Sequence, residues 1–255
     1  MTLLVGILRF NLRHYFLKNR IQFRNMGYLV KNVSSMKWDP SPSPTVFRKR
    51  LELLGEKESG QVTSVVKYEK NSSFRSHAHP DGEEILVLEG IFEDNHGKWP
   101  AGTYLLNPEG FEHAPSSKDG CVLFVKLKQF PGLDREHVVI DTKDDTNWDV
   151  VTDSIKRCQL YPPKKLDERK SNGKYKDTMD LFTLKERTEL ELENIECGLE
   201  VYVINGSLVF DEKQHPVGSW IKIPPDDIPE DKVVTVSSEG GASIYVKRNH
   251  LGSKL

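Results

Sequence analysis

From Val46 onward, short apolar runs alternate with turn residues, a pattern typical of β-strands. Each run is rich in β-branched or large apolar residues and is bounded by Gly, Pro, Asn or Asp. No long segment after residue 46 has a convincing helical period. In the first half of the chain the predicted strands cover residues 61–69, 84–90, 102–107 and 121–127. Many short strands at close spacing predict an antiparallel sandwich or barrel.

A second set of predicted strands follows in the other half of the chain. It covers residues 179–184, 188–192, 199–206, 218–223, 232–236 and 242–248. Residues 164–177, which separate the two sets, are charged and contain glycine, so we expect a loop there.

The two sets of strands align without a gap when the chain is shifted by 116 residues, since 206 − 90 = 116. The shift places identical turn residues or aromatic residues on one another: Gly90 on Gly206, Pro100 on Pro216, Gly102 on Gly218, Tyr104 on Trp220 and Pro108 on Pro224. These are positions of turn geometry and strand aromatics, so the repeat predicts two copies of one β unit.

Length and composition indicate the number of domains and the kind of ligand to expect. The 255 residues suffice for two domains, and 36 basic against 38 acidic side chains leave a net charge of −2. Without a basic excess or a long apolar run, we expect neither a nucleic-acid nor a membrane partner, and a small molecule is the expected ligand. Three widely spaced cysteines form no disulfide framework, which is typical of an intracellular protein.

The N-terminal segment, residues 1–37, has a different composition. It lacks Asp and Glu and spreads basic residues among apolar ones, as on a basic amphipathic helix. This resembles a mitochondrial presequence; the alternatives are a surface helix or an upstream extension, with translation starting at Met26. The expected location is therefore cytoplasmic or mitochondrial. A Pro- and Ser-rich stretch, residues 38–44, marks the end of this extension.

Candidate chemistry gathers beside the apolar run 84–90. His77 and His79 are two residues apart, so their side chains share one face of a strand. Glu83 follows a Pro-Asp-Gly turn, and His113 comes later in the chain. Three imidazoles and a carboxylate suit Fe(II), Mn, Zn, Ni or Cu. A six-coordinate metal would keep open positions, whereas four ligands would complete a tetrahedral zinc site.

The spacing of these residues resembles the two motifs of the cupin family, G-x5-H-x-H-x(3,4)-E-x6-G and G-x5-P-x-G-x2-H-x3-N. The matching positions are Asn71, His77, His79, Glu83 and Gly90, then Gly102, Pro108, Gly110, His113 and Ser117. Asn71 and Ser117 depart from the motifs, and neither position is a metal ligand in the family. The resemblance implies an all-β fold of two tandem jelly-roll-like cupin barrels and one divalent metal, zinc or Fe(II) with Mn, Ni and Cu open. Its ligands would be His77, His79, Glu83 and His113.

The likeness is closer to ChrR-type cupins, which occur in bacterial anti-sigma factors and in acetylacetone-cleaving dioxygenases, and it covers about residues 38–130. The helical zinc domain of those anti-sigma factors has no match in this chain, so a role in transcription is not implied. We expect an N-terminal extension at 1–37, a metal-binding cupin at 38–135 and a second cupin at 136–250. The resemblance also implies a homodimer.

The second cupin is expected to be degenerate. The 116-residue shift carries the four ligand positions onto Glu193, Ile195, Leu199 and Pro229. Isoleucine, leucine and proline offer no ligand atom, so a metal-binding shell is not expected there.

The resemblance implies a dioxygenase-like oxidoreductase acting on a small diketone-like or acidic substrate at the first cupin. The alternative is a non-catalytic zinc-binding module with a structural or ligand-sensing role, and a weaker third hypothesis is an isomerase or epimerase. No general base stands out among the residues. Glu84, next to Glu83, should point to the opposite face of the strand and reach solvent.

Overall fold

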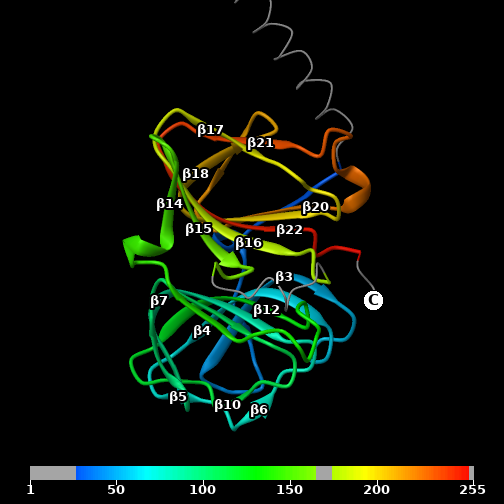
Figure 1. Cartoon of the computed structure of the whole chain (residues 1–255). Helices are drawn as coiled ribbons and strands as arrows, with labels where there is room; N and C mark the ends of the chain where they lie inside the picture. Colours follow the sequence, from blue (N-terminus) through cyan, green and yellow to red (C-terminus); the bar gives the residue numbers. More distant parts are fainter. Residues whose placement is uncertain (1–26, 165–173, 253–255) are drawn as a thin grey trace, which may run out of the picture.

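The computed structural model describes residues 27–164 and 174–252. Two β-barrels lie one above the other in Figure 1. Most of the basic N-terminal segment and of the loop predicted at 164–177 falls outside the described residues. Within these, no helix has the length and apolar character needed to cross a membrane.

The first barrel is built mainly from one large antiparallel sheet, in the order β13-β9-β7-β12-β4-β3-β2, with short strands at its open end. Its strands are β2 (Asp39–Pro40), β3 (Val46–Leu54), β4 (Gln61–Tyr68), β5 (Ser72–Ser73), β6 (His77–Ala78), β7 (Glu83–Asp94), β8 (Gly97–Pro100), β9 (Thr103–Asn107), β10 (Glu112–His113), β11 (Ser116–Ser117), β12 (Cys121–Leu127) and β13 (Val138–Asp141). The all-β prediction is confirmed.

The second barrel repeats this plan in the order β1-β20-β18-β22-β16-β15-β14. Its strands are β1 (Leu29–Asn32), β14 (Trp148–Thr152), β15 (Ile155–Tyr161), β16 (Thr178–Leu184), β17 (Thr188–Leu192), β18 (Leu199–Phe210), β19 (Lys213–Pro216), β20 (Ser219–Ile223), β21 (Val234–Ser238) and β22 (Ala242–Arg248). The described helices are short 3₁₀ turns at Val33–Ser35, Asp145–Asn147 and Pro225–Asp227.

The internal repeat is a repeat of backbone geometry. Strands β7, β8 and β9 coincide with β18, β19 and β20 at both ends under the predicted shift, because 199 − 83 and 223 − 107 both equal 116. Gly90 and Gly206 have φ of +72° and +71°, and a Cβ at either would lie 2.1 Å from a carbonyl oxygen of the facing turn. Glycine is therefore required where the long strand bends in each barrel.

Each repeat gives one strand to the sheet of the other. β1 precedes the first barrel in sequence, yet it pairs with β20 of the second, Leu29 facing Lys222. β13 lies in the sequence range predicted for the second repeat, yet it pairs with β9 of the first barrel, Val138 facing Leu106. The two registers correspond under the same shift, since 222 − 106 = 116. The ranges 38–135 and 136–250 remain a prediction of where the repeats divide along the chain.

The barrels meet through an aromatic layer that contains buried charges. Phe124 of β12 stacks on Tyr202 of β18 with ring centroids 4.5 Å apart. Lys247 donates to Glu84 over 2.8 Å, and Lys126 forms the reciprocal pair with Glu200. All four charged side chains are almost fully buried.

The prediction that Glu84 reaches solvent is wrong. Strand alternation does turn it away from Glu83, but the second barrel covers that face and leaves Glu84 only 2% exposed. Tyr104 and Tyr245 donate hydrogen bonds to the same carboxylate. A sequence pattern identifies a face of a strand and cannot say what packs on it.

Candidate metal centre

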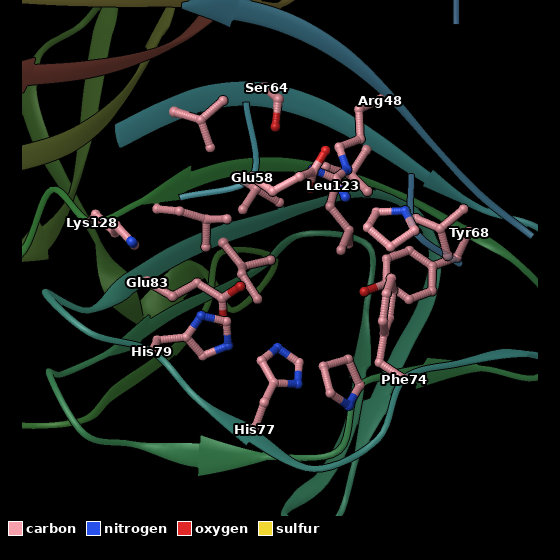
Figure 2. A pocket seen from close by; sticks show the side chains of 18 of the residues that line it. Arg48, Glu58, Ser64, Tyr68, Phe74, His77, His79, Glu83, Leu123 and Lys128 are labelled. Atoms are coloured by element: carbon pink, nitrogen blue, oxygen red, sulfur yellow. The ribbon is translucent and has the colours of Figure 1, made fainter. Parts of the chain in front are cut away.

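The four predicted ligand residues come together at one end of the first barrel. His77 lies on β6 and faces His113 of β10 across an antiparallel pair. His79 lies in the turn that follows β6, and Glu83 is the first residue of β7. Figure 2 shows His77, His79 and Glu83 gathered at one side of a cavity. Residues 36 positions apart in the chain, His77 and His113, thus become neighbours through strand pairing.

The donor atoms converge on one point. The ligand nitrogens of His77, His79 and His113 all lie within 4.8 Å of one another. Nε2 of His79 and Nε2 of His113 are 2.9 Å apart. Oε2 of Glu83 is 3.5 Å from the first of these nitrogens and 3.3 Å from the second.

Hydrogen bonds fix the orientation of two of the rings. Nδ1 of His77 donates to the carbonyl oxygen of Arg75 over 2.8 Å, because a carbonyl can only accept. Nδ1 of His113 lies 3.1 Å from Oδ2 of Asp94. In the neutral imidazole each of these bonds leaves Nε2 with a lone pair that faces the other ligands.

Asp94 supports His113 from behind. Its other oxygen, Oδ1, accepts from the backbone N–H groups of His96 and Gly97 and from Nε1 of Trp99, over 2.9, 3.0 and 3.1 Å. Burial alone would raise the pKa of Asp94, but the hydrogen bonds from His113, from His96 and from Trp99 outweigh it and lower that pKa. Asp94 is therefore a carboxylate that holds the ring of His113 in place.

Asn107 plays the same part for Glu83. Its side-chain Nδ2 donates to Oε2 of Glu83 over 2.9 Å, and both residues are buried. Sequence reasoning missed Asp94 and Asn107. Asp94 lies between two predicted strands, and Asn107 ends the predicted strand 102–107. Their pairing with ligands depends on the registers of β7 with β8 and β9.

Burial and neighbouring charges set the protonation of the histidines. Burial is the main cause that lowers the pKa of His79, with the nearby His113 and His77 adding to it against the opposing charge of Glu83. Burial would also lower the pKa of His113, but the hydrogen bond to Asp94 and the charge of Glu83 raise it overall. A cation between these groups would replace the proton that the carboxylates otherwise favour on His113.

The donor set fits a divalent metal. Two imidazole nitrogens 2.9 Å apart, with a carboxylate oxygen beside both, can share one small cation. Imidazole and carboxylate suit Fe(II), Mn, Ni, Cu and Zn alike, so the residues do not select among them.

A cavity of about 470 Å³ lies inside the barrel next to this cluster. Its wall is largely apolar and includes Val46, Val62, Val66, Ile85, Leu123 and Val125. The volume is in the range of small-molecule sites. His96 and Glu112, by contrast, are exposed and lie outside this lining.

The second barrel has an apolar interior in the equivalent place. Leu199 stands where Glu83 begins β7. Strand pairing sets Val234 opposite Leu192, as His113 stands opposite His77. The equivalent of His113 is therefore Val234, and the prediction of Pro229 is wrong. Ser116 pairs with Glu93 of β7, and Ser237 pairs with Val209 of β18. Glu93 and Val209 are 116 residues apart, whereas Ser116 and Ser237 are 121 apart. The second repeat therefore has five extra residues before β21.

Residues 27–131 match the family described as the ChrR cupin-like domain. No curated protein matches the sequence.

Solved structures match over most of the chain at low identity. A putative dioxygenase from Nostoc punctiforme is 13% identical with a TM-score of 0.64, over 91% of this chain and 86% of that one. A nickel complex of a bacterial pirin from Escherichia coli is 12% identical with a TM-score of 0.63, over 88% and 100%. Salicylate 1,2-dioxygenase from Pseudoaminobacter salicylatoxidans, solved with gentisate, is 10% identical with a TM-score of 0.57, over 88% and 81%.

Identities this low speak for the fold alone. Together with the repeated strand order, they show that the two barrels have the fold of these solved structures. The family match covers the first barrel, which is similar to the ChrR cupin-like domain over residues 27–131.

Proposed function

We propose that this protein is a metal-dependent, dioxygenase-like oxidoreductase that acts on a small molecule in its first barrel. One observation carries the proposal: three histidine nitrogens and the Glu83 carboxylate converge beside an apolar cavity of about 470 Å³. A cavity of this volume admits a small substrate, and its largely apolar wall can bury the apolar part of that substrate. The fold neighbours include a putative dioxygenase and salicylate 1,2-dioxygenase, which is consistent with the proposal.

Different residues would bind the metal, orient its ligands and orient the substrate. His77, His79, Glu83 and His113 would hold the metal, which would supply Lewis-acid polarisation of a substrate oxygen and, if redox-active, activation of dioxygen. Asp94 and Asn107 keep His113 and Glu83 oriented toward the centre. The apolar wall orients the rest of the substrate and excludes water.

A second candidate is a closed zinc site with a structural or ligand-sensing role. It is favoured by the number of donors, because three histidines and one carboxylate are enough for tetrahedral zinc. In this case the cavity would take a ligand without turning it over.

Oxygen uptake distinguishes the two. The full chain, purified without chelator or histidine tag, is analysed for metal, reconstituted with Fe(II) and given pentane-2,4-dione or salicylate in an oxygen electrode. Metal-dependent uptake that is lost in His79→Ala, and kept in the exposed control His96→Ala, supports the oxidoreductase. Stoichiometric zinc with no uptake after iron is restored contradicts it.

A further inference from the structure

The hydroxyl of Tyr68 lies in the cavity wall without a hydrogen-bond partner among the described residues. Tyr68 is the last residue of β4, and its side chain is buried, with 8% of the residue exposed. Figure 2 shows its oxygen pointing into the cavity, on the side where His77 lies. A hydroxyl that opens into a cavity and has no protein partner among the described residues is available to a ligand.

Aromatic contacts hold the Tyr68 ring in a fixed relation to the metal ligands. Its ring centroid is 5.8 Å from that of Phe74 and 6.0 Å from that of Phe92, both edge-to-face. Phe74 in turn lies 6.2 Å from His77, and Phe92 lies 6.1 Å from His113. The hydroxyl is therefore preorganised with respect to the histidine cluster.

Tyr68 is a hydrogen-bond donor at neutral pH. Burial, and after it the negative charge of Glu83, raise the pKa of the phenol well above its ordinary value, against the opposing charge of Arg48. Arg48 also lines the cavity, but its guanidinium is paired with Glu58 at 3.1 Å.

The other β4 side chains that line the cavity are mostly apolar. Val62, Ser64 and Val66 precede Tyr68 on the inward face of β4, so the phenol is the end of a mostly apolar stripe. Across from it β12 contributes Leu123 and Val125. A few convergent polar groups in an apolar pocket orient a ligand, and the apolar surface binds its remainder.

We propose that Tyr68 donates a hydrogen bond to an oxygen atom of the substrate, and that the apolar cavity takes an aliphatic tail attached to that oxygen-bearing head. This inference rests on the proposed function and names the group that recognises the substrate.

The test uses the full chain loaded with nickel, so that binding is measured without turnover. Nickel content is determined first, and isothermal titration calorimetry then measures the affinity for pentane-2,4-dione and heptane-3,5-dione. The variant is Tyr68→Phe. The matched control is Tyr202→Phe, a buried tyrosine between the barrels that is outside the cavity lining.

The wild type should bind heptane-3,5-dione roughly 15-fold more tightly than pentane-2,4-dione, since it carries two more methylene groups and each buried methylene is worth about fourfold. Tyr68→Phe should weaken both by about fivefold, the worth of one neutral hydrogen bond, and keep the ratio between them. Its melting temperature should not fall, because the hydroxyl has no protein partner to lose. Tyr202→Phe should bind both probes as the wild type does.

Equal affinity of wild type and Tyr68→Phe would overturn the assignment of Tyr68. Nickel-loaded wild type that binds neither dione would overturn the proposed recognition of an oxygen-bearing head and an apolar tail, while leaving the metal centre standing. A chain that takes up no nickel or other divalent metal would overturn the proposed function, and this inference with it.

Discussion

Lys126 of the first barrel is paired with Glu200 of the second, and Lys247 of the second is paired with Glu84 of the first. Glu84 and Glu200 are equivalent under the 116-residue repeat, so the interface contains two ion pairs that mirror each other. Trp220 and His250 hydrogen-bond to Glu200, and Lys126 donates to Thr63. The second barrel thus contributes buried partners to the strand that begins with Glu83, the proposed metal ligand.

Removing one partner of a buried pair should destabilise the protein strongly. Lys247→Met leaves Glu84 buried with its charge uncompensated, and we expect a loss of about 3–5 kcal/mol in the free energy of unfolding. Urea denaturation followed by tryptophan fluorescence measures it. Lys213→Met, whose ammonium is largely exposed, is the control and should change the free energy of unfolding much less. Equal losses in the free energy of unfolding would show that the buried pair is no more important for stability than the exposed one.

His250 should make stability depend on pH. Burial, with the charges of Lys247 and Lys126, lowers its pKa from 6.5 to about 4, although Glu200 opposes the shift. Between these two values the unfolded chain binds the proton and the folded protein does not. Stability is therefore present above pH 6.5 and is lost as the pH falls toward 4, by roughly 3 kcal/mol in all.

Unfolding free energies measured in urea at several pH values test this. His250→Gln keeps a hydrogen-bond donor for Glu200 but cannot titrate, so its stability should fall less steeply than that of the wild type between pH 6.5 and 4. Parallel curves for the two proteins would assign the acid sensitivity to other groups.

Gly206 should not tolerate a side chain. Its φ is +71°, and a methyl group added at its Cα would lie only 2.1 Å from the carbonyl oxygen of Gly241, so Gly206→Ala should destabilise the protein by roughly 2–4 kcal/mol. Gly240→Ala is the matched control, since no heavy atom lies within 4 Å of its Cβ position. Thermal denaturation gives the melting temperatures of both variants. A melting temperature of Gly206→Ala equal to that of Gly240→Ala would contradict the close approach of the two turns.

Asp94 should act on metal affinity without being a ligand. Asp94→Asn replaces the charged acceptor of the His113 Nδ1–H hydrogen bond with a neutral amide. The affinity of the protein for a divalent metal should therefore fall about 10–100-fold. Competition with a chromogenic chelator measures the affinity. Glu112→Gln, an exposed carboxylate next to His113 in sequence, should leave it unchanged. Unaltered affinity in Asp94→Asn would remove this residue from the centre.

Local sequence information sufficed for many of the strands, though not for β3, β14 or β15, and for the residues that meet at the centre. The spacing of His77, His79, Glu83 and His113 predicted a cluster, because strand alternation and two turns determine their positions. The repeat also predicted that the second barrel would lack ligands, although an insertion moved the equivalent of His113 from Pro229 to Val234.

What escaped prediction depends on contacts between distant segments. The burial of Glu84 requires Lys247 and Tyr245, which lie more than a hundred residues away in the other barrel. The exchange of β1 and β13 between the sheets leaves no local signal, since either strand could have paired within its own repeat. Asp94 and Asn107 likewise acquire their roles only when β8 and β9 pair with β7.

The central claim is that the first barrel holds one divalent metal through its three histidines and Glu83. Elemental analysis by mass spectrometry of the full chain, after incubation with divalent metals and desalting, tests it most directly. We predict about one ion per chain in the wild type and in His96→Ala, with loss of most of it in His113→Ala. A folded wild type that retains no metal, or a His113→Ala variant that retains as much as the wild type, would contradict it.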